Sequence, residues 1–436
     1  MSTKKDRLFT PSYICILAAN FLLFAGFWLL IPVLPFYLKE TYHCPEAILG
    51  AILSCYTVSE LCMRPFSGFI MDKFPRKPIY ILFYLAGAAA FAGYMLAATL
   101  TAFIIIRMLH GLAFGGVTVG GNTLCVDIMP SSRRGEGLGY YGLTNNTAMA
   151  LGPMTGLFMH GSFSFEQIFL TGLLTSATGL ACALCVKART PESLRKRREN
   201  EEAIAHAERS YQLLDDLKET AAVHPSVPTR RASRVSLDRF ILIKGIPVSI
   251  SLLMLSVPYG ATTNFVALYA HEIGLTAPAG FFFTLMAAGM GVSRIFAGRK
   301  VDQGYITQCI KYGYYPVILA FLLLSLCRFV APASLAGATV LFYIVPMLLG
   351  VGFGVMFPAM NSLYINLAPN NKRATATSTY LTAWDVGLGI GICTSGVVAQ
   401  QFTFYMVYLI GSFICLASMV YFVRRVTPHY ERNKLR

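Results

Sequence analysis

Long apolar runs, separated by short polar connections, make up most of the chain. A membrane-spanning helix needs about 20 consecutive apolar residues, because that length crosses the hydrocarbon core of a bilayer. Twelve runs reach this length, and we expect one helix from each. The predicted spans are 11–38, 46–71, 78–99, 101–129, 136–160, 165–187, 240–271, 277–299, 310–331, 334–367, 372–400 and 402–424. The pattern therefore predicts an all-α membrane protein with twelve transmembrane helices.

A long polar segment separates the predicted helices into two groups of six. We predict it, at 188–239, to be a cytoplasmic linker that joins an N-terminal half, 1–187, to a C-terminal half, 240–436. Mixed charges followed by Pro, Ser and Arg residues are typical of a tether. A regulatory docking element is the alternative interpretation of this segment.

The two halves also repeat each other. A pattern of Arg, Gly and Asp at four-residue spacing in 64–72 recurs in 294–302, and 108–152 aligns without gaps to 347–391. The repeated motif comprises Arg64, Gly68 and Asp72 in the first half and Arg294, Gly298 and Asp302 in the second. Because each half begins on the same side and holds six spans, we expect two pseudo-symmetric six-helix units in parallel orientation.

The charged residues are few and unevenly placed. They make up 13% of the chain, against about 25% in soluble domains. The net charge of +15 comes mainly from Lys and Arg at the two ends, in the linker and in alternate connections, so the positive-inside rule places both termini in the cytoplasm. The charge thus sets topology and gives no argument for a nucleic-acid partner. We expect no cleavable signal peptide, and together with the basic central segment this favours a bacterial cytoplasmic (inner) membrane. We also predict that the protein is a monomer.

Other functional classes lack their sequence signatures. Nearly all of the 11 Cys residues fall within or beside predicted spans, and the 7 His residues show no metal-ligand spacing. We find no P-loop for ATP and no nucleophile motif with a plausible triad. We therefore expect no metal, no cofactor and no enzyme activity, with a small-molecule substrate and the lipid bilayer as partners.

The connection after the second predicted span carries a recognisable motif. The segment 68–77, GFIMDKFPRK, resembles the GxxxDxxGRK signature of the major facilitator superfamily, with Pro75 in place of the second glycine. The resemblance implies a latch on the cytoplasmic side, in which Asp72 is linked to basic residues of the next connection, Arg133 and Arg134. The gate residues implied in this way are Arg64, Gly68, Asp72, Arg76, Arg134, Arg294, Gly298 and Asp302.

Two further elements strengthen the resemblance. Arg107 begins a segment similar to the superfamily's RxxxGxxxG element, and Gly152, Pro153 and Gly156 match the GPxxG signature associated with its proton-linked antiporters. Pro interrupts the helical hydrogen bonds and glycines admit a neighbouring helix, so the second element predicts a bend and a tight contact. It favours antiport, although GPxxG also occurs where only packing is at stake.

A few charges inside the predicted spans are candidates for proton coupling. An intramembrane charge is costly, by about 2.5–3.5 kcal/mol for Arg at a helix centre, so each should face a cavity or a partner. Glu60 and Arg64 are four residues apart and share a helix face, which allows either a buried ion pair or a proton-titrated Glu60. Asp385 is either a second titrating or substrate-contacting group, or an interhelical hydrogen-bonding carboxylate. Arg107 completes the predicted coupling set.

The substrate cavity is predicted from helix position and residue type. Aromatic rings with a few amides suit an amphipathic organic molecule. The candidate lining residues are Asn20, Phe24, Trp28, Tyr141, Tyr259, Asn264, Tyr364, Tyr380 and Trp384.

The sequence therefore predicts a secondary transporter of the major facilitator fold that works by alternating access. By resemblance, the proton gradient drives export of a small amphipathic compound. Proton-coupled uptake of a nutrient or metabolite is the alternative within transport. A non-transporting membrane receptor on the same fold is the alternative from another class, and transport activity in vesicles would separate them.

Overall fold

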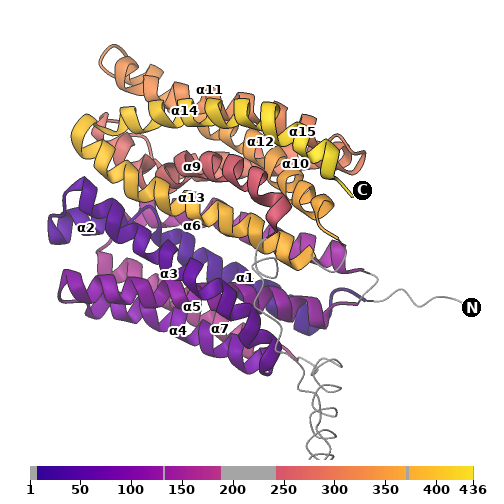
Figure 1. The fold of residues 1–436 in the computed structure, drawn as a ribbon. Coiled ribbons are helices and arrows are strands. Elements are labelled where there is room, and N and C mark those ends of the chain that lie inside the picture. The colour runs from indigo at the N-terminus through magenta and orange to yellow at the C-terminus, as the bar shows by residue number, and fades with distance from the viewer. Residues whose placement is uncertain (1–6, 131–132, 188–241, 370–372, 436) are drawn as a thin grey trace, which may run out of the picture.

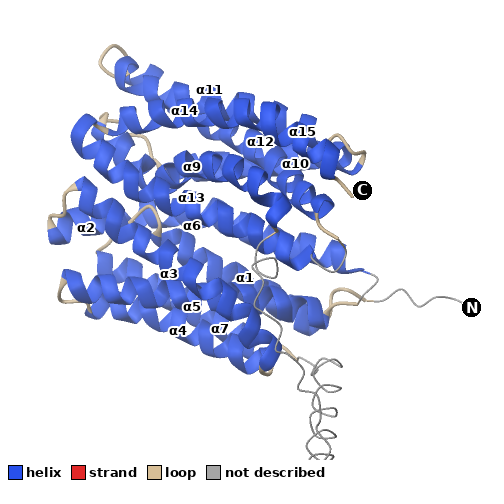
Figure 2. Ribbon diagram, in the orientation of Figure 1, coloured by secondary structure: helices blue, strands red, loops and turns tan. Residues whose placement is uncertain are grey.

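The structure, a computed structural model, describes residues 7–130, 133–187, 242–369 and 373–435. The predicted linker, 188–239, lies outside the described residues. The long helices are α1 (Pro11–Leu30), α3 (Glu46–Lys73), α4 (Arg76–Leu96), α5 (Leu100–Ile128), α6 (Arg134–His160), α7 (Phe165–Cys185), α9 (Ile246–Glu272), α10 (Gly280–Asp302), α11 (Ile306–Val330), α12 (Leu335–Leu367), α13 (Arg373–Phe402) and α14 (Phe404–Tyr421). Short elements are α2 (Leu34–Tyr42), α15 (Thr427–Asn433), a 3₁₀ turn (Ile243–Gly245) and a π-helical turn (Phe422–Val426). The described residues form helices and loops only (Figure 2).

The first predicted span, 11–38, is divided between α1 and α2. The chain turns at 31–33, where Pro32 cannot donate a backbone hydrogen bond and clashes with the preceding turn. Elsewhere, local capping places helix starts where the polar connections meet apolar runs. Thr10 accepts a hydrogen bond from the Tyr13 amide at 3.2 Å, and Ser164 forms a capping box with Gln167 at the start of α7.

Each half is a bundle held by contacts among its own helices. In the first half α1 packs against α6 and α7, and α5 packs against α3 and α4. The second half repeats this arrangement, with α9 against α13 and α14, and α12 against α10 and α11. Figure 1 shows the first bundle below the second, with α1 beginning and α15 ending toward the right.

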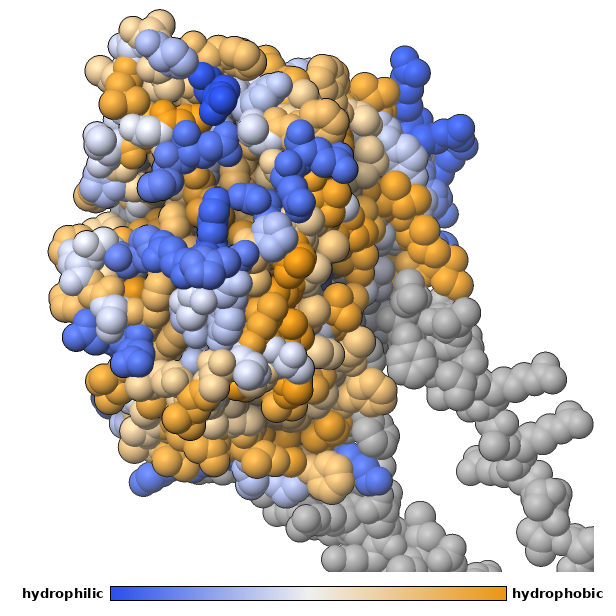
Figure 3. Space-filling view, turned by 90° about the vertical axis from the view of Figure 1, so that its left-hand side faces the viewer, coloured by the Kyte–Doolittle hydropathy of each residue, from blue (hydrophilic) through white to orange (hydrophobic). Residues whose placement is uncertain are grey.

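The halves meet mainly through two helix pairs, α3 with α13 and α6 with α10, and also where α2 contacts α9. The α3–α13 contact is close at the end of the bundle that carries α2, which we call the α2 end. There a Cβ on Gly50 would lie 2.7 Å from the carbonyl oxygen of Ile392, and the Ala47 amide donates to Gln400 Oε1 at 3.1 Å. Hydrophilic side chains cross the middle of this end face (Figure 3).

The apolar surface matches a membrane environment. Among the described residues, ten helices are long and apolar enough to cross a membrane, and large apolar side chains such as Leu96, Phe158 and Phe413 are exposed on the outside. The helices α6 and α10 are not among the ten. They pack against each other between the halves, and α6 carries polar residues that face inward.

Candidate functional site

A cavity of about 490 Å³ lies between the two halves. Side chains from α1, α3, α5 and α6 line it on one side, and side chains from α9, α10, α12 and α13 line it on the other. The helix contacts at the α2 end close it there. Toward the opposite end its lining includes Asn122, Gly142 and Leu381, which are all exposed. The cavity therefore extends toward the end of the bundle where α1 begins.

Most of the predicted lining residues are found in this cavity. Those that line it are Asn20, Phe24, Trp28, Tyr141, Tyr259, Asn264, Tyr380 and Trp384. Tyr364 does not line it, because its position on α12 directs the ring into the second bundle. Its side chain is fully buried, and its hydroxyl lies 2.7 Å from Ser249 Oγ.

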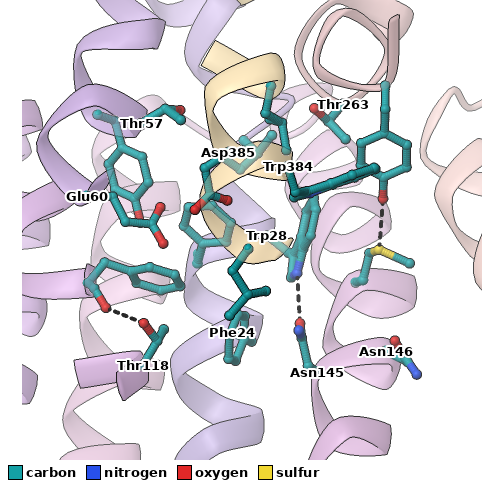
Figure 4. A pocket seen from close by; sticks show the side chains of 18 of the residues that line it. Phe24, Trp28, Thr57, Glu60, Thr118, Asn145, Asn146, Thr263, Trp384 and Asp385 are labelled. Carbon is teal, nitrogen blue, oxygen red and sulfur yellow. Dashed lines mark hydrogen bonds between the residues drawn. The ribbon is translucent and has the colours of Figure 1, made fainter. Parts of the chain in front are cut away.

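A polar network on α1 and α6 orients part of the cavity wall. Asn20 Nδ2 donates to Thr144 Oγ1 at 2.7 Å and to the Tyr141 carbonyl oxygen at 3.2 Å. The Trp28 ring nitrogen donates to Asn145 Oδ1 at 3.3 Å (Figure 4). These bonds hold the amide-bearing face of α6 toward the cavity.

The opposite wall is aromatic. The Trp384 ring lies 4.7 Å from Phe357 and 5.0 Å from Tyr259, measured between ring centroids. The Tyr259 hydroxyl lies 3.5 Å from the sulfur of Met149, across the boundary between the halves. The cavity thus combines amide side chains on α6 with aromatic rings from both halves.

An ion-pair cluster at the cavity wall joins the two halves. Arg64 Nη2 lies 2.9 Å from Glu60 Oε1 on the same helix, α3, and 2.8 Å from Asp385 Oδ2 on α13. Glu60 and Asp385 are both buried, and Figure 4 shows their carboxyl groups pointing toward one another. The predicted Glu60–Arg64 pair is confirmed, whereas the contact with Asp385 was missed. We call these three residues the bridging triad.

Arg107 is buried beside the triad and has no carboxylate partner among the described residues. Its guanidinium carbon lies 4.3 Å from the centroid of the Tyr56 ring, a cation–π contact that partly replaces hydration. One turn later, His110 forms a hydrogen bond with the Tyr94 hydroxyl at 3.0 Å. This bond gives the His110 ring a structural partner inside the first bundle.

Arg64 and Arg294, the arginines of the repeated motif, both line the cavity. Each lies inside an apolar run, where a charge needs a partner or a cavity. The Nε of Arg294 is buried without a hydrogen-bond partner. Arg294 also forms no ion pair with the part of the chain that the structure describes.

The structure describes only some of the remaining motif residues. Arg76 Nη1 lies 2.5 Å from Asp127 Oδ1, linking α4 to α5. Among the described residues, a Cβ on Gly68 would meet nothing within 4 Å. The side chains of four motif residues lie outside the described part of the structure: Asp72, Arg134, Gly298 and Asp302.

The GPxxG element forms a tight contact between α6 and α1. A Cβ on Gly152 would lie 2.9 Å from the Leu29 amide nitrogen, and one on Gly156 would clash with the Leu29 carbonyl oxygen. Pro153 lies inside α6, which continues through it from Arg134 to His160. The predicted close packing is therefore present in this structure.

Two six-helix halves around a polar, charged cavity form the architecture of a membrane transporter. The sequence profile of the Major Facilitator Superfamily matches residues 16–392 and 304–436. The chain belongs to this superfamily of integral membrane transporters.

Relatives and solved structures agree with this assignment. The quinolone resistance protein NorA of Staphylococcus aureus is 30% identical over 139 residues, which is 32% of this chain and 36% of NorA. The staphylopine export protein of Staphylococcus aureus strain Mu50 is 20% identical over 386 residues, 88% of each chain. The nucleoside transporter NupG has a TM-score of 0.68 at 16% identity, covering 94% of this chain and 99% of NupG. A POT family transporter in complex with 5-aminolevulinic acid has a TM-score of 0.73 at 12% identity, covering 96% of each chain.

Proposed function

We propose that this transporter exports a small amphipathic organic compound in exchange for protons, by alternating access of the cavity to the two sides of the membrane. The observation that carries this proposal is the bridging triad. It places two carboxylates and one shared arginine at the cavity wall. It also spans the boundary between the halves, which must open when access to the cavity switches from one side of the membrane to the other.

Coupling of protons to transport follows because Arg64 is shared by a carboxylate from each half. In the described conformation Arg64 pairs with Asp385, and the α3–α13 contact closes the α2 end. When these helices separate there, Asp385 loses its cation, and a buried unpaired charge costs several kcal/mol, about 3–5 when a pair is broken. A proton from the newly opened side removes that charge. On return, Arg64 approaches Asp385 again and the proton leaves toward the other side.

The direction of exchange depends on topology. With both termini in the cytoplasm, as the basic residues predict, the α2 end faces outward and the described cavity faces inward. Protons then enter from outside and leave inside, while the substrate binds inside and leaves outside. The names of the two relatives, a quinolone resistance protein and a staphylopine export protein, support export of small organic molecules.

The motif at 68–77 supports a second part of the proposal, a gate on the cytoplasmic side. The Arg76–Asp127 pair links the first turn of α4 to the last turn of α5. Along the chain, Asp72 shortly precedes α4, and Arg134 follows α5. Formation of this gate would close the inner side when the α2 end opens.

The test is flux in proteoliposomes under an imposed pH gradient, with internal pH recorded by a trapped dye. The panel contains amphipathic cations, anions, zwitterions and neutral sugars. Substrate movement against the proton flow is the expected result. Substrate movement with the protons would replace export by uptake, and absence of flux with every compound would favour a receptor.

A further inference from the structure

The two halves carry the same arginine in different electrostatic surroundings. Arg64 on α3 and Arg294 on α10 are separated by 230 positions, the offset of the repeated motif, and both line the cavity. The helix pairs are equivalent as well, because α3 packs on α13 as α10 packs on α6. Of these two arginines, only Arg64 has ion-pair partners among the described residues.

The residues equivalent to the two acidic partners of Arg64 carry no charge at the second arginine, Arg294. At the same offset, the counterpart of Glu60 is Met290. The second alignment, at an offset of 239, pairs Asp385 with Asn146. Met290 and Asn146 both line the cavity together with Arg294, so the replacement lies in the site itself. The fold therefore repeats the arginine and leaves out its two carboxylates.

The space beside Arg294, where a carboxylate partner would lie, is open to a ligand. Arg294 and Asn146 line the central cavity, and both also line a groove of about 720 Å³ between α6 and α10. Apolar side chains of these helices, among them Leu143 and Leu151, form most of the remaining groove wall. An anionic group at Arg294 thus has room for an apolar body on either side.

We propose that Arg294 and Asn146 bind an anionic group of the transported molecule, so that the substrate is an organic anion or zwitterion with an aromatic or aliphatic body. This inference rests on the proposed transport function. The guanidinium supplies charge and paired N–H donors that match a carboxylate, and the Asn146 amide supplies a further donor without opposing charge. The aromatic wall of Trp384, Phe357 and Tyr259 accepts the body.

The charge balance explains why such a ligand is held reversibly. A buried arginine without a counter-ion is costly in a membrane protein, and a bound carboxylate would supply the missing charge while it stays. A resident carboxylate at 146 or 290 would occupy the arginine permanently, as Asp385 and Glu60 occupy Arg64. Neutral residues at these two positions keep the arginine available.

Binding can be measured without transport, because the chain has 2 Trp residues and both, Trp28 and Trp384, line the cavity. Purified protein in nanodiscs is titrated with para-tert-butylbenzoate and with the neutral para-tert-butylbenzamide, following Trp fluorescence. The wild type should bind the carboxylate more tightly than the amide. Arg294→Gln should weaken carboxylate binding about 10-fold or more and leave amide binding nearly unchanged.

A second variant protects the test against misfolding of Arg294→Gln. Asn146→Asp restores the carboxylate of the first half, so it should pair with Arg294 and weaken carboxylate binding to a similar extent. Asn145→Asp is the matched control, since it adds the same charge one residue away, where the amide bonds to Trp28. A smaller loss is expected there. Equal losses in both Asp variants, or no carboxylate preference in the wild type, would overturn the proposal.

The lipid used distinguishes a substrate from a bound headgroup. In nanodiscs of phosphatidylcholine alone, carboxylate binding should be as tight as in discs with anionic lipid. Carboxylate binding that falls as anionic lipid is added to the wild type, with no such lipid dependence in Arg294→Gln, would assign Arg294 to a lipid phosphate instead. Because no pH gradient is present, failure of proton coupling leaves these results unaffected, and failure of anion binding leaves the flux test of coupling intact.

Discussion

Replacement of Asp385 by Asn isolates the contact that joins the two halves. The amide keeps the size of the side chain and removes its charge. Arg64 retains Glu60 at 2.9 Å, so the guanidinium is not left without a counter-ion. The described conformation loses the 2.8 Å pair between Arg64 and Asp385, whose side chains are 18% and 10% exposed. The experiment therefore removes the inter-half pair with Arg64, together with the repulsion between Asp385 and Glu60.

The expected size of the effect follows from that geometry. A close interaction with a charged group contributes about 1.5–3 kcal/mol, and at this low exposure solvent screening reduces it little. The pair exists only while α3 and α13 are together at Arg64. The variant should therefore shift the conformational equilibrium away from the described state by a factor of about 10–150.

Hydrogen–deuterium exchange at the α2 end measures this shift. The amides of 46–50 and 393–402 lie at the α3–α13 contact in the described conformation, and we expect them to exchange faster in Asp385→Asn. Proton-driven flux should be lost in the same variant. Glu431→Gln is the control, because it breaks the ion pair with Lys434, which lies within the second half and outside the proposed gate. Unchanged exchange together with normal driven flux in Asp385→Asn would refute the bridging role.

The other predictions concern the second carboxylate and the two ends of the bundle. Glu60→Gln should retain folding and helix content but lose proton-driven flux, measured by circular dichroism and proteoliposome assay; normal driven flux would exclude Glu60 as a proton carrier. Gly396→Ala should disfavour the described conformation and speed exchange at the α2 end, because the new Cβ would clash with the Glu46 carbonyl oxygen. Gly389→Ala is its control, since there the nearest atom lies at 3.4 Å. Asp72→Asn should slow turnover with little change in substrate affinity, and unaltered turnover would argue against a gate at this motif.

Local patterns carried most of the correct predictions. The helices follow from apolar runs of membrane-spanning length, and the Glu60–Arg64 pair follows from four-residue spacing on one helix. The repeat located the equivalent positions in the two halves. Close packing at Gly152 and Gly156 follows from the absence of a side chain where helices cross.

Predictions that required the orientation of a helix were less complete. A membrane helix is apolar on most of its faces, so its pattern does not separate the lipid side from the protein side, and Tyr364 was assigned to the cavity although it points into the second bundle. The first span was predicted as one helix, whereas the structure divides it at Pro32 into α1 and α2.

The sequence by itself determined the class of the protein, because apolar length, charge placement and internal repetition are properties of the chain that need no long-range contact. Only the tertiary structure decided that Arg64 joins the halves through Asp385 and that Arg294 has no such partner among the described residues. Arg64 and Asp385 are far apart along the chain, and their contact depends on how two bundles pack against each other. A charge inside an apolar run indicates that compensation is needed, whereas the fold determines which group provides it.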